Sequence, residues 1–234
     1  MGITQLNFEG KTKIEVSLDV IRAYEPQDGY FLAFAGGKDS VVLYDIALKS
    51  GVKLDAHYNL TGIDPPELVK FIKEYYPSIA IEPPKMTMWR GIEKKGLPTR
   101  RRRWCCEYLK YHSGKGRVRL TGIRADESSA RRKLCFVTKL KGDTLVHPLF
   151  LWSTAEVWEY IRENKLPYCC LYDEGFKRLG CLVCPLARRI QRQMEIQRYP
   201  KYVEAYKRAN RRHALKMGKT QQSADEYFEW WLNL

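Results

Sequence analysis

Small, cationic and hydroxyl residues follow an apolar stretch near the start of the chain. After the strand-like run 30–34 come Ala35, Gly36, Gly37, Lys38, Asp39 and Ser40. Glycines let the backbone approach an anion closely, and the N–H groups at a helix N-terminus attract phosphate oxygens. Lys38 adds a positive charge and Ser40 a hydroxyl. We therefore expect this turn to bind the phosphates of a nucleotide.

The spacing of this turn excludes two common nucleotide motifs. A Walker A loop has four residues between its first glycine and the Gly-Lys-Ser/Thr, and this sequence is too short for it. The dinucleotide pattern G-x-G-x-x-G is also missing. The simplest alternative is an ordinary strand-to-helix turn in which Ser40 caps the helix.

The cysteines are a second group of residues that could carry chemistry. The pair Cys181 and Cys184 has the C-x-x-C spacing of a metal or redox site, and Cys105 and Cys106 are its natural partners. Adjacent cysteines converge poorly on one zinc ion, whereas in a [4Fe–4S] cluster each thiolate binds a different iron. We expect a [4Fe–4S] cluster on these four residues. Zinc, a redox dithiol and structural thiols are the alternatives.

Three other cysteines complete the set of seven. Cys169 and Cys170 form a competing adjacent pair that spacing does not exclude. Cys135 lies in an apolar stretch, so we expect it to be a buried thiol.

The chain is strongly basic, with a formal net charge of +14. Such a charge indicates a polyanionic partner, and several arginines are clustered. The clusters that we expect to contact nucleic acid are Arg100, Arg101, Arg102 and Arg103, together with Arg131 and Arg132. A solvated surface is the alternative for any single cluster. No apolar stretch has the length of a membrane span, so we expect a cytoplasmic protein without a membrane partner.

Strand and helix patterns alternate around these residues. Strands are predicted at 30–34, 53–59, 79–81, 117–122 and 144–146, and helices at 40–49, 66–76, 87–95 and 104–112. Ser153 and Glu156 form a capping box before another helix, and helical patterns cover 186–217 and 224–232. This order predicts an α/β fold with three layers, in which helices cover both faces of a mostly parallel sheet. We expect a lead-in over 1–29, a nucleotide-binding domain over 30–187 and a C-terminal helical extension over 188–234.

An ordered set of segments resembles the phosphoadenosine phosphosulfate reductase family, a branch of the PP-loop ATP pyrophosphatase superfamily. The segments are 35–40, 61–67, 104–110, 122–128, 147–153, 171–175 and 180–185. The usual loop begins with serine, where this chain has Ala35. The resemblance implies an adenine-nucleotide α-hydrolase-like fold and cleavage of ATP, bound with Mg²⁺, between its α- and β-phosphates.

The same resemblance implies roles for individual residues. Lys38, Ser40 and Arg124 would act on the phosphates, and Asp39 would orient the loop or contact magnesium. Glu127 would hold Arg124, although a surface ion pair is the alternative for these two residues. The implied nucleotide contacts also include Thr61, Gly62 and Gly122.

The four-cysteine arrangement is similar to that of the iron–sulfur members, which include adenosine phosphosulfate reductases and DndC-type sulfurtransferases. The reductases use a cysteine in a C-terminal tail, and this sequence has none after Cys184. We therefore expect an ATP-dependent sulfurtransferase that adenylylates an acceptor, a component of DNA or tRNA. Its partners would be an adenine nucleotide, a nucleic acid and a sulfur donor such as a cysteine desulfurase. The oligomeric state is open, and a homodimer is one alternative. A sulfonucleotide reductase and a non-catalytic iron–sulfur nucleic-acid-binding module are the alternatives.

Overall fold

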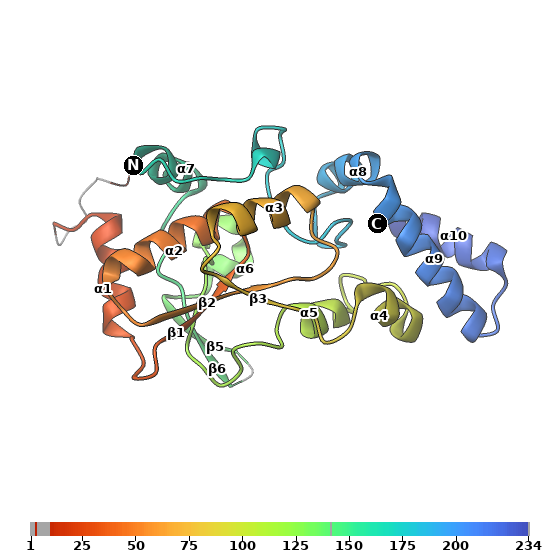
Figure 1. Cartoon of the computed structure of the whole chain (residues 1–234), viewed down its shortest axis with the longest axis horizontal. Coiled ribbons are helices and arrows are strands. Elements are labelled where there is room, and N and C mark those ends of the chain that lie inside the picture. Colours follow the sequence, from red (N-terminus) through yellow and green to blue (C-terminus); the bar gives the residue numbers. More distant parts are fainter. Residues whose placement is uncertain (1–2, 4–9, 141, 234) are drawn as a thin grey trace. The chain divides into compact units, whose positions relative to one another are not determined.

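The protein is described by a computed structural model that covers Ile3 and residues 10–140 and 142–233 (Figure 1). Its contacts divide the chain into two compact units. The first unit contains residues 1–58, 67–82 and 114–172, and the second contains residues 59–66, 83–113 and 173–234. Each unit is therefore assembled from three separate stretches of sequence.

A six-stranded sheet forms the centre of the first unit, with strand order β3-β2-β1-β4-β6-β5. The strands are β1 (Tyr30–Phe34), β2 (Leu54–Asn59), β3 (Ala80–Glu82), β4 (Arg119–Leu120), β5 (Val137–Leu140) and β6 (Asp143–Val146). Strand β1 pairs in parallel with both β2 and β4, and β4 pairs in parallel with β6. Only the hairpin partner β5 is antiparallel to β6 among the pairs described. The predicted mostly parallel α/β fold is confirmed, and β5 is a strand that the sequence pattern did not indicate.

Helices flank this sheet (Figure 1). They are α1 (Lys13–Ala23), α2 (Lys38–Ser50), α3 (Pro66–Tyr75), α6 (Ser129–Arg132) and α7 (Thr154–Glu163). Helix α2 buries an apolar stripe that includes Val42, Leu43 and Ile46, each with 0% exposure. Burial of such side chains stabilises the fold by about 1.5–3 kcal/mol each. The predicted capping box of α7 is present, because Ser153 and Glu156 each accept a backbone N–H of the other.

His147 follows β6 and is fully buried in the first unit. Its Nδ1 is 2.6 Å from Thr121 Oγ1 and its Nε2 is 2.9 Å from Thr138 Oγ1. Burial lowers the pKa of His147 to about 4. The imidazole is therefore neutral in the folded protein, and it links the ends of β4 and β6 to β5.

This lowered pKa makes folding sensitive to acid. The unfolded chain takes up the proton near pH 6.5, whereas the folded chain resists it down to about pH 4, so stability present above pH 6.5 is lost as the pH falls through this window. We expect His147 to contribute about 2 kcal/mol to the loss of unfolding free energy between pH 7 and pH 5. Urea unfolding of the wild type and of His147→Gln at both pH values checks this. An equal pH dependence in the two proteins would contradict it.

The second unit is helical, with α4 (Met88–Lys95), α5 (Trp104–Leu109), α8 (Arg189–Arg198), α9 (Pro200–Lys216) and α10 (Gln221–Leu232). Helices α4 and α10 both pack on α9. Tyr206 of α9 lies between Trp89 and Trp231, with both ring centroids at 5.2 Å. The predicted long helical stretch after Pro185 is interrupted at Tyr199, because a residue that precedes a proline is disfavoured in the helical conformation.

The basic charge is unevenly distributed between the two units. The second unit has 22 Lys and Arg against 10 Asp and Glu, whereas the first unit has 19 against 17. The second unit therefore carries +12 of the net charge of +14. Among the described helices, none combines the length and the apolar character that a membrane crossing requires.

Candidate functional site

The turn between β1 and α2 has the backbone expected of a phosphate-binding loop. Helix α2 begins at Lys38 with Gly37 as its N-cap, two residues earlier than predicted. Ser40 is not the cap, because its Oγ donates to the Gly37 carbonyl at 2.8 Å. Gly36 has φ +68°, and a Cβ there would lie 2.7 Å from Ile72 and 2.8 Å from the Leu68 side chain. Any other residue would be strained at this positive φ and would have to displace Ile72 and Leu68.

Asp39 connects this turn to the loop after β4. Its Oδ2 lies 2.8 Å from Lys38 Nζ, and its Oδ1 accepts a hydrogen bond from Arg124 Nε at 2.7 Å. A Cβ on Gly122 would lie only 3.2 Å from the Asp39 Cβ, so the two loops are in close contact. The loops after β1 and β4 flank the point where the strand order reverses, and this is where open α/β sheets bind ligands. The structure thus brings together Lys38, Asp39, Gly122 and Arg124.

Arg124 is 2% exposed, and each of its three guanidinium nitrogens donates a hydrogen bond. Nη1 donates to the Trp152 carbonyl at 3.2 Å and Nη2 donates to Thr154 Oγ1 at 3.1 Å. Glu127 holds Arg124 through the main chain, by accepting its backbone N–H at 3.0 Å, while the Glu127 carboxylate pairs with Arg131. Arg124 therefore fixes the position of Asp39, and a direct contact between Arg124 and phosphate remains a prediction.

Tyr172 is a residue at this turn that was not predicted. The Lys38 backbone N–H donates to the Tyr172 hydroxyl at 2.9 Å. Tyr172 ends the short 3₁₀ turn Cys170–Tyr172, and its ring packs edge-on against Trp158 with centroids 4.9 Å apart. Tyr172 belongs to one of the segments that carry the family resemblance, and this was the only available signal.

The four predicted ligand cysteines all belong to the second unit. Cys105 and Cys106 occupy the first turn of α5, and their thiols are hydrogen-bonded to each other. This interaction lowers the pKa of Cys106 and raises that of Cys105, on which Cys181 and Cys184 also act electrostatically. The four thiols are therefore close enough to influence one another electrostatically, and their role as cluster ligands remains a prediction. The competing pair Cys169–Cys170 belongs to the first unit.

The spacing of these thiols bears on the type of group that they could hold. No three His, Cys, Asp or Glu side chains in the described part of the chain converge on a point where one metal ion would sit. A polynuclear iron–sulfur cluster does not require such convergence, because each cysteine binds a different iron. The four thiols and the half-buried Lys110 are compatible with a cluster of this kind.

Lys110 and Thr61 surround Cys181. Electrostatic interaction with Cys181, reinforced by Asp64, raises the pKa of the half-buried Lys110, so its ammonium group is retained. Thr61 Oγ1 lies 3.7 Å from Cys181 Sγ, and the Thr61 backbone N–H donates to Asp64 Oδ2 at 2.9 Å. Thr61 was predicted to contact the nucleotide, and so was Gly62, which has φ +74° and no atom near its Cβ position. Lys110 was not predicted, because spacing alone does not indicate which lysine faces a thiol.

The run Arg100–Arg103 is exposed and is separated from the cysteine pair by Trp104 alone. Arg100 Nε donates to the Pro185 carbonyl at 2.9 Å and Arg102 Nη2 donates to the Lys95 carbonyl at 2.7 Å. None of the four has an acidic partner among the described residues. Arg132 is also exposed, whereas Arg131 pairs with Glu127.

The prediction for Cys135 is wrong. Cys135 is exposed, and its thiol donates to the Val137 carbonyl at 2.8 Å. The apolar neighbours that suggested burial do not enclose the thiol, because Leu134 is itself exposed and Phe136 is only half-buried.

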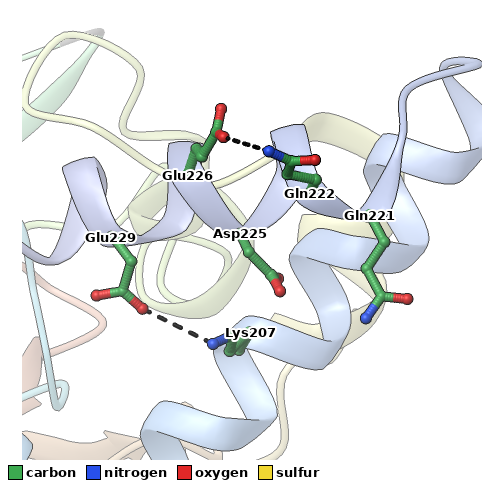
Figure 2. A pocket seen from close by; sticks show the side chains of 6 residues that line it. All are labelled: Lys207, Gln221, Gln222, Asp225, Glu226 and Glu229. Carbon is green, nitrogen blue, oxygen red and sulfur yellow. Dashed lines mark hydrogen bonds and ion pairs between the residues drawn. The ribbon is translucent and has the colours of Figure 1, made fainter.

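A hollow with a volume of about 740 Å³ lies between α9 and α10 (Figure 2). Its lining residues are polar, namely Lys207, Gln221, Gln222, Asp225, Glu226 and Glu229. Lys207 Nζ is 3.7 Å from Glu229 Oε1, and Gln222 donates to Glu226 at 3.2 Å. The hollow contains none of the predicted site residues.

Comparison with known proteins identifies the family of this chain. The sequence pattern of the phosphoadenosine phosphosulfate reductase domain matches residues 29–187. Two uncharacterized proteins of Methanocaldococcus jannaschii are 29% and 32% identical over 79% and 75% of this chain, which spans only 42% and 47% of their length. Adenosine 5′-phosphosulfate reductase 2 of Bacillus subtilis is 30% identical over 72% of this chain and 78% of its own.

The fold also matches solved structures. The phosphoadenylyl-sulfate reductase of Candida auris, crystallised as a phosphate complex, superposes with a TM-score of 0.54. It is 22% identical in sequence, and the match covers 77% of this chain and 98% of that one. At this identity, the match establishes the shared fold.

Proposed function

Because the chain belongs to the phosphoadenosine phosphosulfate reductase domain family, we propose that it is an ATP-dependent sulfurtransferase. ATP binds with its phosphates on the β1–α2 turn. The observation that carries this proposal is the contact of Lys38, Asp39 and Arg124 at the carboxyl ends of β1 and β4. Gly36 and Gly37 supply close backbone approach there, and Lys38 supplies a charge that is only 7% exposed to solvent.

In the first chemical step, an oxygen of the acceptor attacks the α-phosphorus of ATP. The bond between the α-phosphorus and the bridging oxygen breaks, and pyrophosphate leaves. Lys38 and the N-terminus of α2 stabilise negative charge on the phosphates, and Asp39 orients Lys38 or contacts the Mg²⁺ of the substrate. The protein contributes positioning and electrostatic stabilisation and forms no covalent bond in this step.

In the second step, sulfide attacks the adenylylated acceptor atom. The bond from that atom to oxygen breaks, AMP leaves, and the acceptor gains the sulfur that replaces its oxygen. Sulfide balances this substitution without a redox agent. If a protein persulfide from a cysteine desulfurase delivers the sulfur, a thiol must also supply two electrons.

Cys105, Cys106, Cys181 and Cys184 would hold a [4Fe–4S] cluster. A cluster with four cysteine ligands has no free coordination position for a substrate. It would therefore act through its redox state and its fixed charge. Lys110 offsets part of the negative charge at Cys181, and Thr61 offers a hydroxyl to the same sulfur. These residues tune the site through charge and hydrogen bonds.

The acceptor that this charge distribution favours is a nucleic acid. The second unit carries +12, and Arg101 and Arg103 are exposed without acidic partners in the described structure. Lysine and arginine side chains that neutralise phosphates release counterions, which makes binding salt-dependent.

Removing Arg101 and Arg103 should therefore weaken nucleic-acid binding. For Arg101→Gln/Arg103→Gln we expect the slope of log K against log salt to become shallower by about 1 for each lost phosphate contact. Fluorescence anisotropy with labelled DNA and tRNA between low and moderate salt measures this slope. The control Lys73→Gln/Arg162→Gln removes two exposed cations from the first unit. Equal losses in both variants would show that only net charge matters.

Anaerobic turnover assays test the proposed function. The protein is incubated with MgATP and sulfide, with and without tRNA or DNA, and pyrophosphate, AMP and incorporated sulfur are measured. We expect pyrophosphate release that depends on the acceptor, with one sulfur inserted for each AMP formed. Tight nucleic-acid binding without ATP cleavage would instead identify a non-catalytic binding module.

A second candidate is a sulfonucleotide reductase. It is favoured by the similarity to adenosine 5′-phosphosulfate reductase 2 of Bacillus subtilis, which extends over most of both chains. This activity would release sulfite from adenosine 5′-phosphosulfate, with a thiol supplying the two electrons. Sulfite production with this substrate and a dithiol, in the absence of ATP, would establish the reductase and exclude the sulfurtransferase as the main activity.

A further inference from the structure

The turn between Cys181 and Cys184 has a backbone conformation that its sequence disfavours. Val183 has φ +55°, in the left-handed region. A side chain branched at Cβ is strained in this region, and such a residue persists only where its surroundings fix it. Leu182 and Val183 are both 0% exposed, so solvent provides no partner for their backbone groups.

Three hydrogen bonds hold this turn. The Leu182 N–H donates to the Ile63 carbonyl at 2.8 Å, and the Tyr206 hydroxyl donates to the Leu182 carbonyl at 3.1 Å. The Val183 N–H donates to Glu195 Oε2 at 2.7 Å. Glu195 is thus the partner of the strained residue itself, and it comes from α8.

Burying the carboxylate of Glu195 is energetically unfavourable. Glu195 is 3% exposed, and its burial raises its pKa. The carboxylate is nevertheless well satisfied, because Gln191 Nε2 donates to Oε1 at 2.8 Å and the buried Arg192 adds a favourable charge. An apolar side chain in its place would leave the Val183 N–H buried and unpaired, which is unfavourable because that group loses its bond to water on folding and gains none in return.

We propose that Glu195 is a positioning residue for the cysteine site. By accepting the Val183 N–H, it holds the left-handed turn and thereby sets the directions in which Cys181 and Cys184 point. This inference rests on the proposed cluster. It also extends the site beyond the matched family domain, because Glu195 lies after residue 187.

The first test compares iron retention among Glu195 variants. In anaerobically reconstituted protein we expect Glu195→Leu to lose iron to a chelator about 10–100-fold faster than the wild type. Glu195→Gln keeps an oxygen that can accept the Val183 N–H, so its rate should stay close to that of the wild type. Glu204→Gln, an exposed change on α9, is the control for loss of a carboxylate. Wild-type retention in Glu195→Leu would overturn the proposal.

The second test is a rescue that a general stabilising role would not produce. Glycine adopts positive φ without strain from a Cβ. Adding Val183→Gly to Glu195→Leu should therefore restore slow iron loss, although the smaller side chain lowers the melting temperature. If the two changes simply add, Glu195 supports the fold and not the turn, and the proposal fails.

Circular dichroism of the iron-free proteins covers the case of misfolding. A double variant that folds when Glu195→Leu does not would support the proposal, since glycine removes the strain. Failure of both to fold would overturn it.

Iron content of the wild type tests the cluster separately. If the wild type binds no iron, the same variants are made with the other five cysteines changed to serine. Binding of phenylarsine oxide to the Cys181–Cys184 pair is then compared among them.

Discussion

Replacing Lys38 by alanine should reduce ATP-dependent pyrophosphate release by about 100- to 1000-fold, the range seen when one preorganised charge-stabilising group is removed. The Lys38 ammonium is poorly exposed and lies 2.8 Å from Asp39, so solvent does not replace it. Its removal also leaves the Asp39 carboxylate paired with Arg124 alone, which adds repulsion toward phosphate. Initial rates of pyrophosphate release at saturating acceptor, with ATP affinity measured in parallel, check this expectation.

The control for Lys38 is Lys73, an exposed lysine on α3. Lys73→Ala removes the same charge from the first unit without touching the turn, and it should retain the wild-type rate. Lys38→Arg tests geometry, because a planar guanidinium does not substitute for a compact ammonium close to a backbone turn. Wild-type turnover in Lys38→Ala would mean that the nucleotide binds elsewhere.

Changing any one of the four grouped cysteines to serine should remove most of the iron. We expect anaerobically reconstituted wild-type protein to contain about four irons per chain and the four single variants to contain fewer than about one. A serine hydroxyl is a much poorer iron ligand than a thiolate, and the remaining thiols of the group cannot complete the ligand set alone. Iron analysis and visible absorption of Cys105→Ser, Cys106→Ser, Cys181→Ser and Cys184→Ser measure the loss.

Two exposed cysteines provide the matched controls. Cys135→Ser and Cys170→Ser remove one thiol each, and both residues are exposed in the first unit. They should keep the wild-type iron content. A wild-type protein that is colourless and contains zinc would contradict the cluster assignment, and loss of iron in Cys170→Ser would show that the competing pair takes part.

Elements with strong local signals were predictable from the sequence. Strand β1 has the predicted bounds, because a continuous apolar run ends shortly before two glycines. Helix α2 ends at Ser50, one residue later than predicted, where Gly51 adopts φ +78° and terminates it. Strand β5 was missed because its burial does not alternate along the strand: Val137 and Thr138 are half-buried, whereas Lys139 and Leu140 are exposed. Four such residues at the edge of a sheet give no periodic pattern.

The predictability of the site follows the same logic. Lys38 and the four cysteines could be proposed because their types and spacing within short segments indicate a chemistry, and Asp39 because of the family resemblance; their roles remain predictions. Tyr172 and Glu195 were not found, because Tyr172 contacts a backbone N–H 134 residues away in sequence and Glu195 contacts one 12 residues away across a turn. Such partners depend on the folded path of the chain. The grouping of residues 59–66 with the helical unit is another feature that no local pattern expresses.

The Tyr172 hydroxyl has a consequence for ligand choice at the β1–α2 turn. It already occupies the Lys38 N–H, so an arriving ligand gains only the difference between its own hydrogen bond and the one that it displaces. A phosphate oxygen forms a charge-assisted hydrogen bond that is stronger than the one it displaces. A water molecule or the hydroxyl of a bare nucleoside gains no binding free energy by the same replacement. If the proposed phosphate site is correct, the Tyr172 hydroxyl would disfavour uncharged ligands at the Lys38 N–H.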